Sequence, residues 1–307
     1  MNMSSAWTRR DTLRALLAGG AALMGADIAR ALPSIRRRIP GSGMELPIIG
    51  LGTYSTFDVG NDPSERAAVR EVLRLFVEHD GAVVDSSPMY GSAESVTGDM
   101  TAELTLRDRL FLATKVWTSG ETAGIEQMQT SFKRLRTTHV DLMQVHNLLD
   151  WRTHLRTLRA WKDDGRIRYI GVTHYTASAY PEVEQVMRSE RLDFVQINYS
   201  LAERDAEQRL LPLAQDRGVA VLVNRPFAQA SLFGKVRGRE LPAWTAEFDC
   251  SSWAQFFLKY VVSHPAVTCA IPATRKPAHL VDNMQAGRGR LPSAAQRQRM
   301  LALLASL

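Results

Sequence analysis

Four side chains that can donate, accept or hold a proton lie at or just after the ends of three consecutive predicted strands. Asp85, Lys115 and His146 close three apolar runs, and Tyr90 follows Asp85 by five positions in the loop of residues 85–91. Singly, each has an ordinary explanation: a helix cap, a strand-edge cation, a core histidine or an amphipathic rim residue. Because neighbouring parallel strands lie ~4.8 Å apart, the four side chains can converge in one small volume and act together.

The residue types suggest an acid–base site. A free phenol has a pKa of ~10, and a cationic Lys115 beside Tyr90 would favour the phenolate and lower that pKa. Asp85 would hold Lys115 charged and in place. His146 would donate a hydrogen bond to the oxygen of a bound molecule and stabilise charge that develops there.

The elements that would carry these residues alternate between strand and helix. Helical stretches occur, for example, at 123–136, 152–164, 178–188 and 205–217. The apolar, strand-like runs cover 47–52, 82–85, 110–116, 140–146, 167–173, 192–198, 219–223 and 267–273. Such alternation over ~250 residues predicts an α/β fold, a (β/α)8 TIM barrel. An open doubly wound sheet would carry GxGxxG after its first strand, but GLGTYS keeps only two of those glycines.

Further elements complete the predicted barrel. RIP and ELPIIGL flank a Gly-Ser-Gly turn, which predicts a hairpin that plugs the bottom of the barrel. Asp62 is the expected N-cap of the first helix, with Pro63 at its first position and Glu65 completing a capping box. The segment 293–307 predicts an extra C-terminal helix.

The first 31 residues have a different character. Arg9 and Arg10 precede an uncharged stretch at 15–26, and the small-x-small pattern Ala29-Arg30-Ala31 follows. The stretch is shorter than the ~20 residues that span a bilayer, so residues 1–31 resemble a twin-arginine signal peptide. This predicts a barrel domain at 32–307, a periplasmic location and contact with the twin-arginine export machinery. The alternative is an N-terminal amphipathic helix on a cytoplasmic protein.

Composition argues against several classes of protein. The net charge of +6, of which residues 1–31 contribute +2, leaves +4 on the mature chain, and no long basic run suggests nucleic acid. Cys250 and Cys269 have no CxxC spacing, and the seven histidines show no HxxxH or HxxEH spacing. We therefore expect neither a disulfide framework nor a metal site.

Several motifs together resemble the aldo-keto reductase family from Arg38 onward: GLGTY, the stretch from Asp85 to Gly91, ATKVW, VDLMQVHN, YIGVTHY, VQINYSLAER and IPATRKPAHLVDN. The resemblance implies a catalytic tetrad of Asp85, Tyr90, Lys115 and His146. It also implies NADP-dependent reduction of an aldehyde or ketone, with hydride going to the carbonyl carbon and a proton from Tyr90 to the oxygen. The short-chain dehydrogenases instead need Tyr-xxx-Lys on one helix, whereas these residues lie 25 positions apart.

The same resemblance implies a cofactor site, although with departures from the family pattern. His174 stands in place of a more usual Asn, Asn224 in place of a stacking aromatic, and Ala273 and His279 where members that prefer NADPH often have Lys and Arg. NADP(H) is favoured and NAD(H) is possible, with Arg275 and Lys276 supplying positive charge. The implied cofactor residues are Gly52, Thr53, Thr173, His174, Gln196, Asn224, Arg225, Pro226, Phe227, Thr274, Arg275, His279 and Asn283.

Only the broad class of the substrate can be predicted from these residues. Tyr54, Trp117 and Trp151 are expected to line the mouth beside His146, which favours an apolar or aromatic carbonyl compound. The altered stacking position and the export signal leave a second hypothesis open, a barrel that binds a nicotinamide cofactor as a sensor or regulatory subunit. An unrelated barrel hydrolase would need paired carboxylates or a metal triad at the strand ends. Oligomeric state is not predicted.

Overall fold

Parallel strands form the centre of this computed structural model, which describes residues 32–307; the predicted signal segment 1–31 lies outside the described residues. The eight-stranded sheet runs in chain order, each strand beside the next. Bridges between Ile49 and Ala270 and between Gly52 and Ala273 join its first strand to its last. The (β/α)8 barrel is therefore confirmed. Its strands are β3 (Leu51–Gly52), β4 (Val83–Asp85), β5 (Phe111–Val116), β6 (Val140–His146), β7 (Ile167–His174), β8 (Phe194–Asn198), β9 (Ala220–Asn224) and β10 (Val267–Ala270).

The seam of the barrel depends on two glycines. A Cβ built on Gly52 would lie 2.8 Å from the carbonyl oxygen of Ile271, and one on Gly50 would lie 2.9 Å from that of Val83. Real Cβ atoms do not approach backbone oxygen so closely. Glycine at both positions therefore allows the first strand to reach its neighbours and close the sheet.

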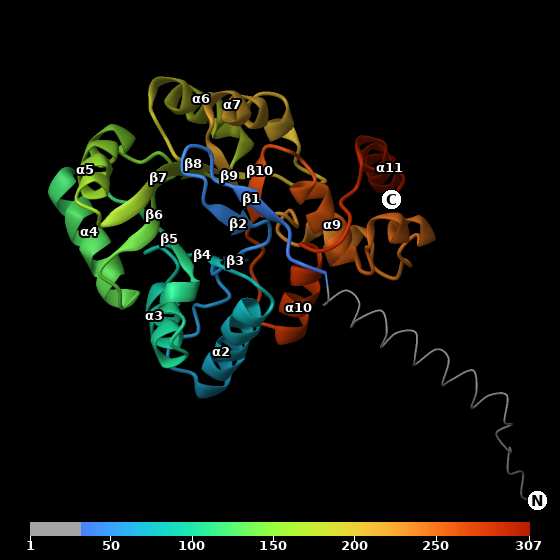
Figure 1. The fold of residues 1–307 in the computed structure, drawn as a ribbon, viewed down its shortest axis with the longest axis horizontal. Coiled ribbons are helices and arrows are strands. Elements are labelled where there is room, and N and C mark those ends of the chain that lie inside the picture. Colours follow the sequence, from blue (N-terminus) through green and yellow to red (C-terminus); the bar gives the residue numbers. More distant parts are fainter. Residues whose placement is uncertain (1–31) are drawn as a thin grey trace, which may run out of the picture. The chain divides into compact units, whose positions relative to one another are not determined.

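Helices surround the strands (Figure 1). Short 3₁₀ turns lie at Arg107–Arg109, Ala177–Ala179, Asp205–Glu207 and Ala243–Phe248. The stretch predicted as one helix at 205–217 is thus a 3₁₀ turn followed by a shorter helix. The α-helices are α2 (Pro63–Glu78), α3 (Ala93–Glu103), α4 (Glu121–Arg134), α5 (Trp151–Asp163), α6 (Tyr180–Ser189), α7 (Leu210–Arg217), α8 (Ser231–Lys235), α9 (Trp253–Val262), α10 (Pro277–Gln285) and α11 (Ala294–Ala305). None of the described helices is long and apolar enough to cross a membrane.

Helix α2 begins as its sequence predicts. The Asp62 side chain accepts a hydrogen bond from the backbone N–H of Glu65 at 2.8 Å, and Pro63 is the first helical residue. The carboxylate of Glu65 pairs with Arg275 at 2.9 Å instead of reaching back to the cap. The N-cap is confirmed, while Glu65 links α2 to the loop after β10.

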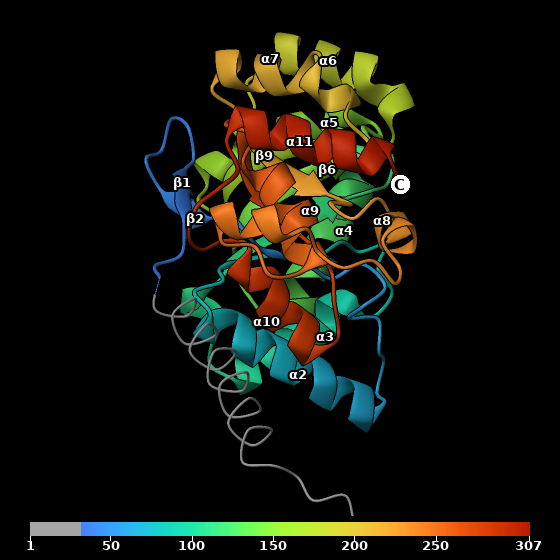
Figure 2. The same cartoon turned by 90° about the vertical axis from the view of Figure 1, so that its right-hand side faces the viewer.

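The N-terminal hairpin plugs one end of the barrel, as predicted. Strands β1 (Arg36–Arg38) and β2 (Glu45–Pro47) pair antiparallel, and Figure 2 places them at the end opposite α8. Ile39 and Leu46 are buried in the barrel interior with residues such as Phe111. The predicted strand 45–51 is divided, because β2 ends at Pro47 and the chain then turns into the barrel.

Candidate active site

The structure brings the four predicted acid–base residues together at the carboxyl ends of the strands. Asp85 is the last residue of β4, Lys115 lies in β5, His146 ends β6, and Tyr90 lies in the loop before α3. The Lys115 Nζ donates to Asp85 Oδ2 and to the carbonyl oxygen of Ser86, both at 2.7 Å. It lies 5.1 Å from the ring centroid of Tyr90.

Lys115 is a fully buried cation with a carboxylate partner. Burial alone would lower its pKa, but the negative charge of Asp85 and the hydrogen bond that Lys115 donates to it outweigh burial, so the pKa of Lys115 is raised. Lys115 therefore stays protonated. This agrees with the predicted role of Asp85, which is to keep Lys115 charged.

Tyr90 departs from the prediction in the direction of its pKa. Burial of the phenol raises the pKa, and although Lys115 lowers it as expected, the net shift is upward. Desolvation of the phenolate is the larger effect, and the rings of Tyr90 and Tyr54 pack edge to face with centroids 5.0 Å apart. Tyr90 is therefore a phenol that keeps its proton at neutral pH, a state suited to a proton donor.

Two glutamines hold the second oxygen of Asp85: Gln144, which the sequence analysis missed, and Gln196, which it assigned to the cofactor site. The Nε2 atoms of Gln144 and Gln196 donate to Asp85 Oδ1 at 3.2 and 2.9 Å. Gln144 is fully buried in β6 and pairs in register with Lys115. A polar residue inside the apolar run VDLMQVH is the signal that could have revealed it. Thr53 supports the same loop by donating to the carbonyl oxygen of Asp85 at 3.0 Å.

His146 is a neutral donor or acceptor and not a cation. Burial lowers its pKa to about 3, and the charge of Lys115 acts in the same direction. The Nδ1 atom lies 3.2 Å from the Oγ of Ser87, and no described residue hydrogen-bonds the Nε2 atom. The Nε2 atom is thus available to a ligand.

Two aromatic side chains lie on the solvent side of the four acid–base residues. Tyr54 is 64% exposed and Trp117 is 36% exposed, and the Trp117 ring lies 6.5 Å from that of His146. Both positions agree with the predicted mouth. Trp151 does not lie there: it is 7% exposed at the start of α5 and belongs to the core between the strands and the helices.

The residues predicted to hold the nicotinamide carboxamide lie on the strands next to the tetrad. The Thr173 Oγ1 donates to the Oε1 of Gln196 at 3.1 Å, and Gln196 in turn contacts Asp85. His174 accepts a hydrogen bond on Nδ1 from the backbone N–H of Thr176 at 3.3 Å, and burial lowers its pKa. Through Thr173 and Gln196, the carboxamide site and the acid–base residues form one continuous hydrogen-bonded group.

The loop after β9 has an unusual backbone. Arg225, Ala228, Gln229 and Ala230 all have positive φ, between 47° and 69°, a conformation that is costly for residues other than glycine and often marks functional loops. The Arg225 guanidinium lies 4.3 Å from the ring centroid of Tyr175. Of the other predicted residues here, Pro226 is buried and Phe227 packs on Phe233, with centroids 5.0 Å apart.

The predicted adenosine-phosphate residues follow β10. Thr274 and Asn283 are buried, while Arg275 and His279 are exposed. The guanidinium of Arg275 is paired with Glu65, so a phosphate there would compete with that carboxylate. Gly52 lies at the barrel seam described above. No group of metal-ligating side chains occurs within residues 32–307.

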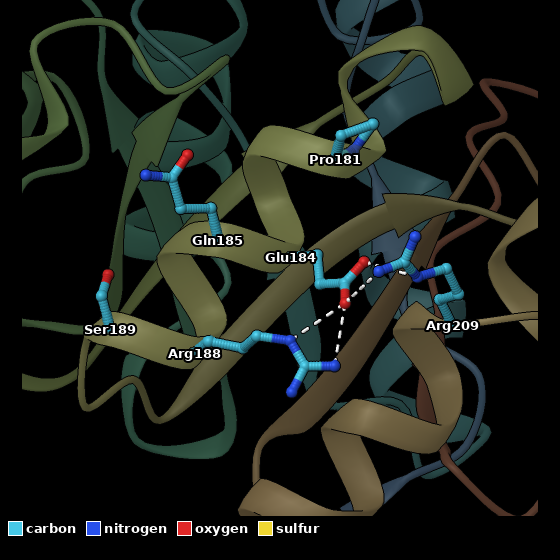
Figure 3. A pocket seen from close by; sticks show the side chains of 6 residues that line it. All are labelled: Pro181, Glu184, Gln185, Arg188, Ser189 and Arg209. Atoms are coloured by element: carbon cyan, nitrogen blue, oxygen red, sulfur yellow. Dashed lines mark hydrogen bonds and ion pairs between the residues drawn. The ribbon is translucent and has the colours of Figure 1, made fainter.

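A surface hollow lies away from the strand ends, between α6 and α7 (Figure 3). Glu184 accepts hydrogen bonds from Arg188 and Arg209 there, each with a contact of 2.8 Å. These hydrogen bonds, led by those from Arg188, lower the pKa of Glu184. The cluster joins two helices on the outside of the barrel and contains none of the predicted site residues.

A closed barrel with a buried lysine–carboxylate pair, a protonated phenol and a neutral histidine at its strand ends defines a barrel enzyme with an acid–base site. The model of the aldo/keto reductase family matches residues 48–298, and the chain belongs to that family. It is 30% identical to the methylglyoxal reductase YeaE of Escherichia coli strain K12 over 250 residues, which cover 78% of this chain and 85% of that protein.

Solved structures agree with this assignment. An aldo/keto reductase of Klebsiella pneumoniae in complex with NADP and acetate has a TM-score of 0.72 at 26% identity, covering 87% of this chain and 94% of that one. An aldo-keto reductase from the same organism in complex with NADPH has a TM-score of 0.74 at 26% identity, covering 88% and 95%.

Proposed function

We propose that this chain reduces an aldehyde or ketone to an alcohol with NADP(H). The observation that carries the proposal is the position of the Tyr90 ring 5.1 Å from the Lys115 Nζ, which itself donates to Asp85 Oδ2 at 2.7 Å. When bound, NADPH supplies the hydride. Tyr90 donates its proton to the carbonyl oxygen, and Lys115 stabilises the phenolate that remains.

His146 assists the same proton transfer by contacting the carbonyl oxygen. Its free Nε2 atom donates a hydrogen bond to the carbonyl oxygen, which orients the substrate and stabilises developing negative charge. Because its pKa is lowered to about 3, His146 does not compete with Tyr90 as the proton donor at neutral pH. Asp85 keeps Lys115 charged through the reaction.

The residues present fit a nicotinamide cofactor. The Oδ1 atom of Asn224 is buried with no hydrogen-bond partner in the described part of the chain, and such an atom favours a ligand that supplies a donor. Thr173, His174 and Gln196 would hold the carboxamide, and Arg225 would contact the pyrophosphate. The Klebsiella pneumoniae relatives bind NADP or NADPH, which supports NADP(H) here.

The test is the decrease in nicotinamide absorbance with residues 32–307, NADPH or NADH, and a panel of carbonyl compounds. Tyr90→Phe is expected to abolish turnover and to retain cofactor binding. Tyr54→Phe is the matched control, because Tyr54 is exposed beside Tyr90, and it is expected to keep turnover. Retained turnover in Tyr90→Phe would contradict the role of Tyr90. Cofactor binding with no turnover on any compound would favour the sensor hypothesis.

For the substrate class, we propose small aldehydes, including 2-oxoaldehydes. The relative at 30% identity is a methylglyoxal reductase, and the exposed rings of Tyr54 and Trp117 lie beside Tyr90 and His146 respectively. The panel therefore includes methylglyoxal beside benzaldehyde and butanal. A kcat/KM for methylglyoxal that is the lowest of the three would contradict this substrate class.

We also propose export by the twin-arginine route, which the sequence of residues 1–31 supports. The test is expression of the full chain with a C-terminal tag in a bacterium that has this pathway, beside the double variant Arg9→Lys with Arg10→Lys. The expected result is a periplasmic chain that starts near Leu32 and is lost from the periplasm in the double variant. A full-length chain confined to the cytoplasm would contradict the proposal.

A further inference from the structure

We propose that Ser87 is a positioning residue that holds His146 in the tautomer with its proton on Nε2. The inference rests on the proposed function for its catalytic consequence, but the tautomer itself can be measured without turnover. Ser87 lies in the loop after β4, two residues after Asp85, and is completely buried.

The hydrogen bonds of the Ser87 hydroxyl determine the direction of its contact with His146. Its Oγ has two partners within residues 32–307: the backbone N–H of Met89 at 3.3 Å and the Nδ1 of His146 at 3.2 Å. A backbone N–H can only donate, so Met89 cannot accept the hydroxyl hydrogen. A buried O–H without an acceptor is costly, and Nδ1 is the acceptor within reach. Ser87 therefore donates to Nδ1.

That direction places the proton of His146. A neutral imidazole carries one N–H, and the other ring nitrogen is an acceptor. His146 is neutral because burial lowers its pKa to about 3. With Nδ1 accepting from Ser87, the ring N–H is on Nε2, the atom that no described residue hydrogen-bonds.

The other tautomer would oppose the proposed chemistry. It would turn a lone pair of Nε2 toward the lone pairs of the carbonyl oxygen, and the hydrogen bond that orients the substrate would be lost. The effect of Ser87 is thus transmitted through His146, and Ser87 needs no contact with substrate or cofactor.

The direct test is NMR of the histidine ring nitrogens in nitrogen-15-labelled protein at neutral pH, without substrate. The chemical shift of each nitrogen reports whether it carries a proton, and His146→Gln identifies the signals of His146. The expected result is a protonated Nε2 in the wild type and a mixture of the two tautomers in Ser87→Ala. A protonated Nδ1 in the wild type, or a single Nε2–H tautomer in Ser87→Ala, would overturn the proposal.

Kinetics provide the second readout. Ser87→Ala is expected to lower kcat about fivefold, the size of one ordinary hydrogen bond, and to leave the Kd for NADPH unchanged. Ser87→Thr, which keeps a hydroxyl, is expected to recover the single tautomer. Ser131→Ala is the matched control, because Ser131 is equally buried but lies on α4 outside the site, and it is expected to change neither readout.

The outcomes separate the two proposals. If the wild type reduces no carbonyl compound while the tautomer still responds to Ser87→Ala, the proposed function fails and the placement of the proton stands. If the wild type turns over and the tautomer does not depend on Ser87, only the present inference fails.

Discussion

Two lysines in the described part of this protein are completely buried, and their pKa values move in opposite directions. Lys115 at the barrel mouth donates to the carboxylate of Asp85, and its pKa is raised. Lys259 in α9 donates to the carbonyl oxygens of Arg288 and Arg290 at 2.7 and 2.9 Å. Burial lowers the pKa of Lys259 to about 8, an effect that the nearby Cys250 and Asp249 offset only in part.

Because both lysines are completely buried, the opposite directions of their pKa shifts come from the charge of their partners. A full negative charge offsets the loss of solvation, whereas two carbonyl dipoles do not. Lys115 can therefore stay a cation beside Tyr90, where the proposed reaction needs one. Lys259 instead holds the segment between α10 and α11. The cluster of Glu184, Arg188 and Arg209 is a third case: the carboxylate is buried, but both arginine side chains are exposed, so solvent screens their charges.

The largest effect is expected for Lys115→Met. It leaves the Asp85 carboxylate buried without its cation, which typically destabilises a protein by about 3–5 kcal/mol, and it removes the charge that stabilises the phenolate of Tyr90. Urea unfolding and NADPH-dependent turnover measure the two effects, and turnover is expected to be lost.

A double variant separates charge imbalance from lost packing. Lys115→Met combined with Asp85→Asn removes both charges and is expected to recover part of the stability but none of the turnover. If the double variant were less stable than Lys115→Met alone, the uncompensated carboxylate would not be the cause of the destabilisation.

Lys259 is expected to make stability depend on pH in the alkaline range. Its pKa is about 8 in the folded protein and ~10.4 in the unfolded chain. Between these values the unfolded chain binds more protons, so the free energy of unfolding rises with pH. Measured against Lys259→Met by urea unfolding from pH 7 to pH 10.5, the wild type should gain about 3 kcal/mol. A difference that stays constant with pH would show that Lys259 keeps its ordinary pKa.

A smaller effect is expected for Gln144→Leu. The Oδ1 of Asp85 would lose one of its two amide donors, and a hydrogen bond to a charged group is worth about a factor of 10. We expect kcat to fall about tenfold, with little loss of stability because the buried and unpartnered Oε1 of Gln144 is removed as well. Gln144→Glu, which places a second carboxylate beside Asp85, should be worse than Gln144→Leu. Wild-type turnover in both variants would contradict the role of Gln144.

The smallest effect is expected for Arg209→Ala in the cluster around Glu184. Arg188 remains to pair with the buried carboxylate of Glu184, and the Arg209 side chain is 71% exposed, so solvent screens its charge and its ion pair contributes little. The melting temperature is expected to change by no more than about 2 °C, with turnover unchanged. A loss of stability as large as that of Lys115→Met would contradict the small contribution expected of the exposed Arg209 side chain.

Much of the fold follows from the pattern of apolar residues, but some boundaries do not. The stripe of α2 is a clear helical pattern, and its members Val69, Leu73 and Phe76 are all buried. Helix α3 has no such stripe, because its buried face includes Glu94 and Thr97. The burial of Glu94 is made possible by partners on other elements, such as the Thr114 hydroxyl that donates to it at 2.6 Å.

The acid–base residues could be predicted because each has a characteristic chemistry and a place at a strand end. Ser87 and Gln144 were missed because a serine in a loop and a glutamine in a strand acquire a role only through the atoms they face. The predicted direction of the pKa shift of Tyr90 was wrong for a related reason. The charge of Lys115 is visible in the sequence, whereas the burial that outweighs it is not.

The sequence by itself determined the alternation of strand and helix, the barrel, and the placement of Asp85, Tyr90, Lys115 and His146 at one face, since local periodicity and chain order are enough for these. The tertiary structure alone decided which polar atoms are buried together, and through this the upward shift of the Tyr90 pKa and the partner of His146. Solvation and hydrogen-bond direction depend on distances between residues far apart in the chain, such as Ser87 and His146, and no local pattern contains them.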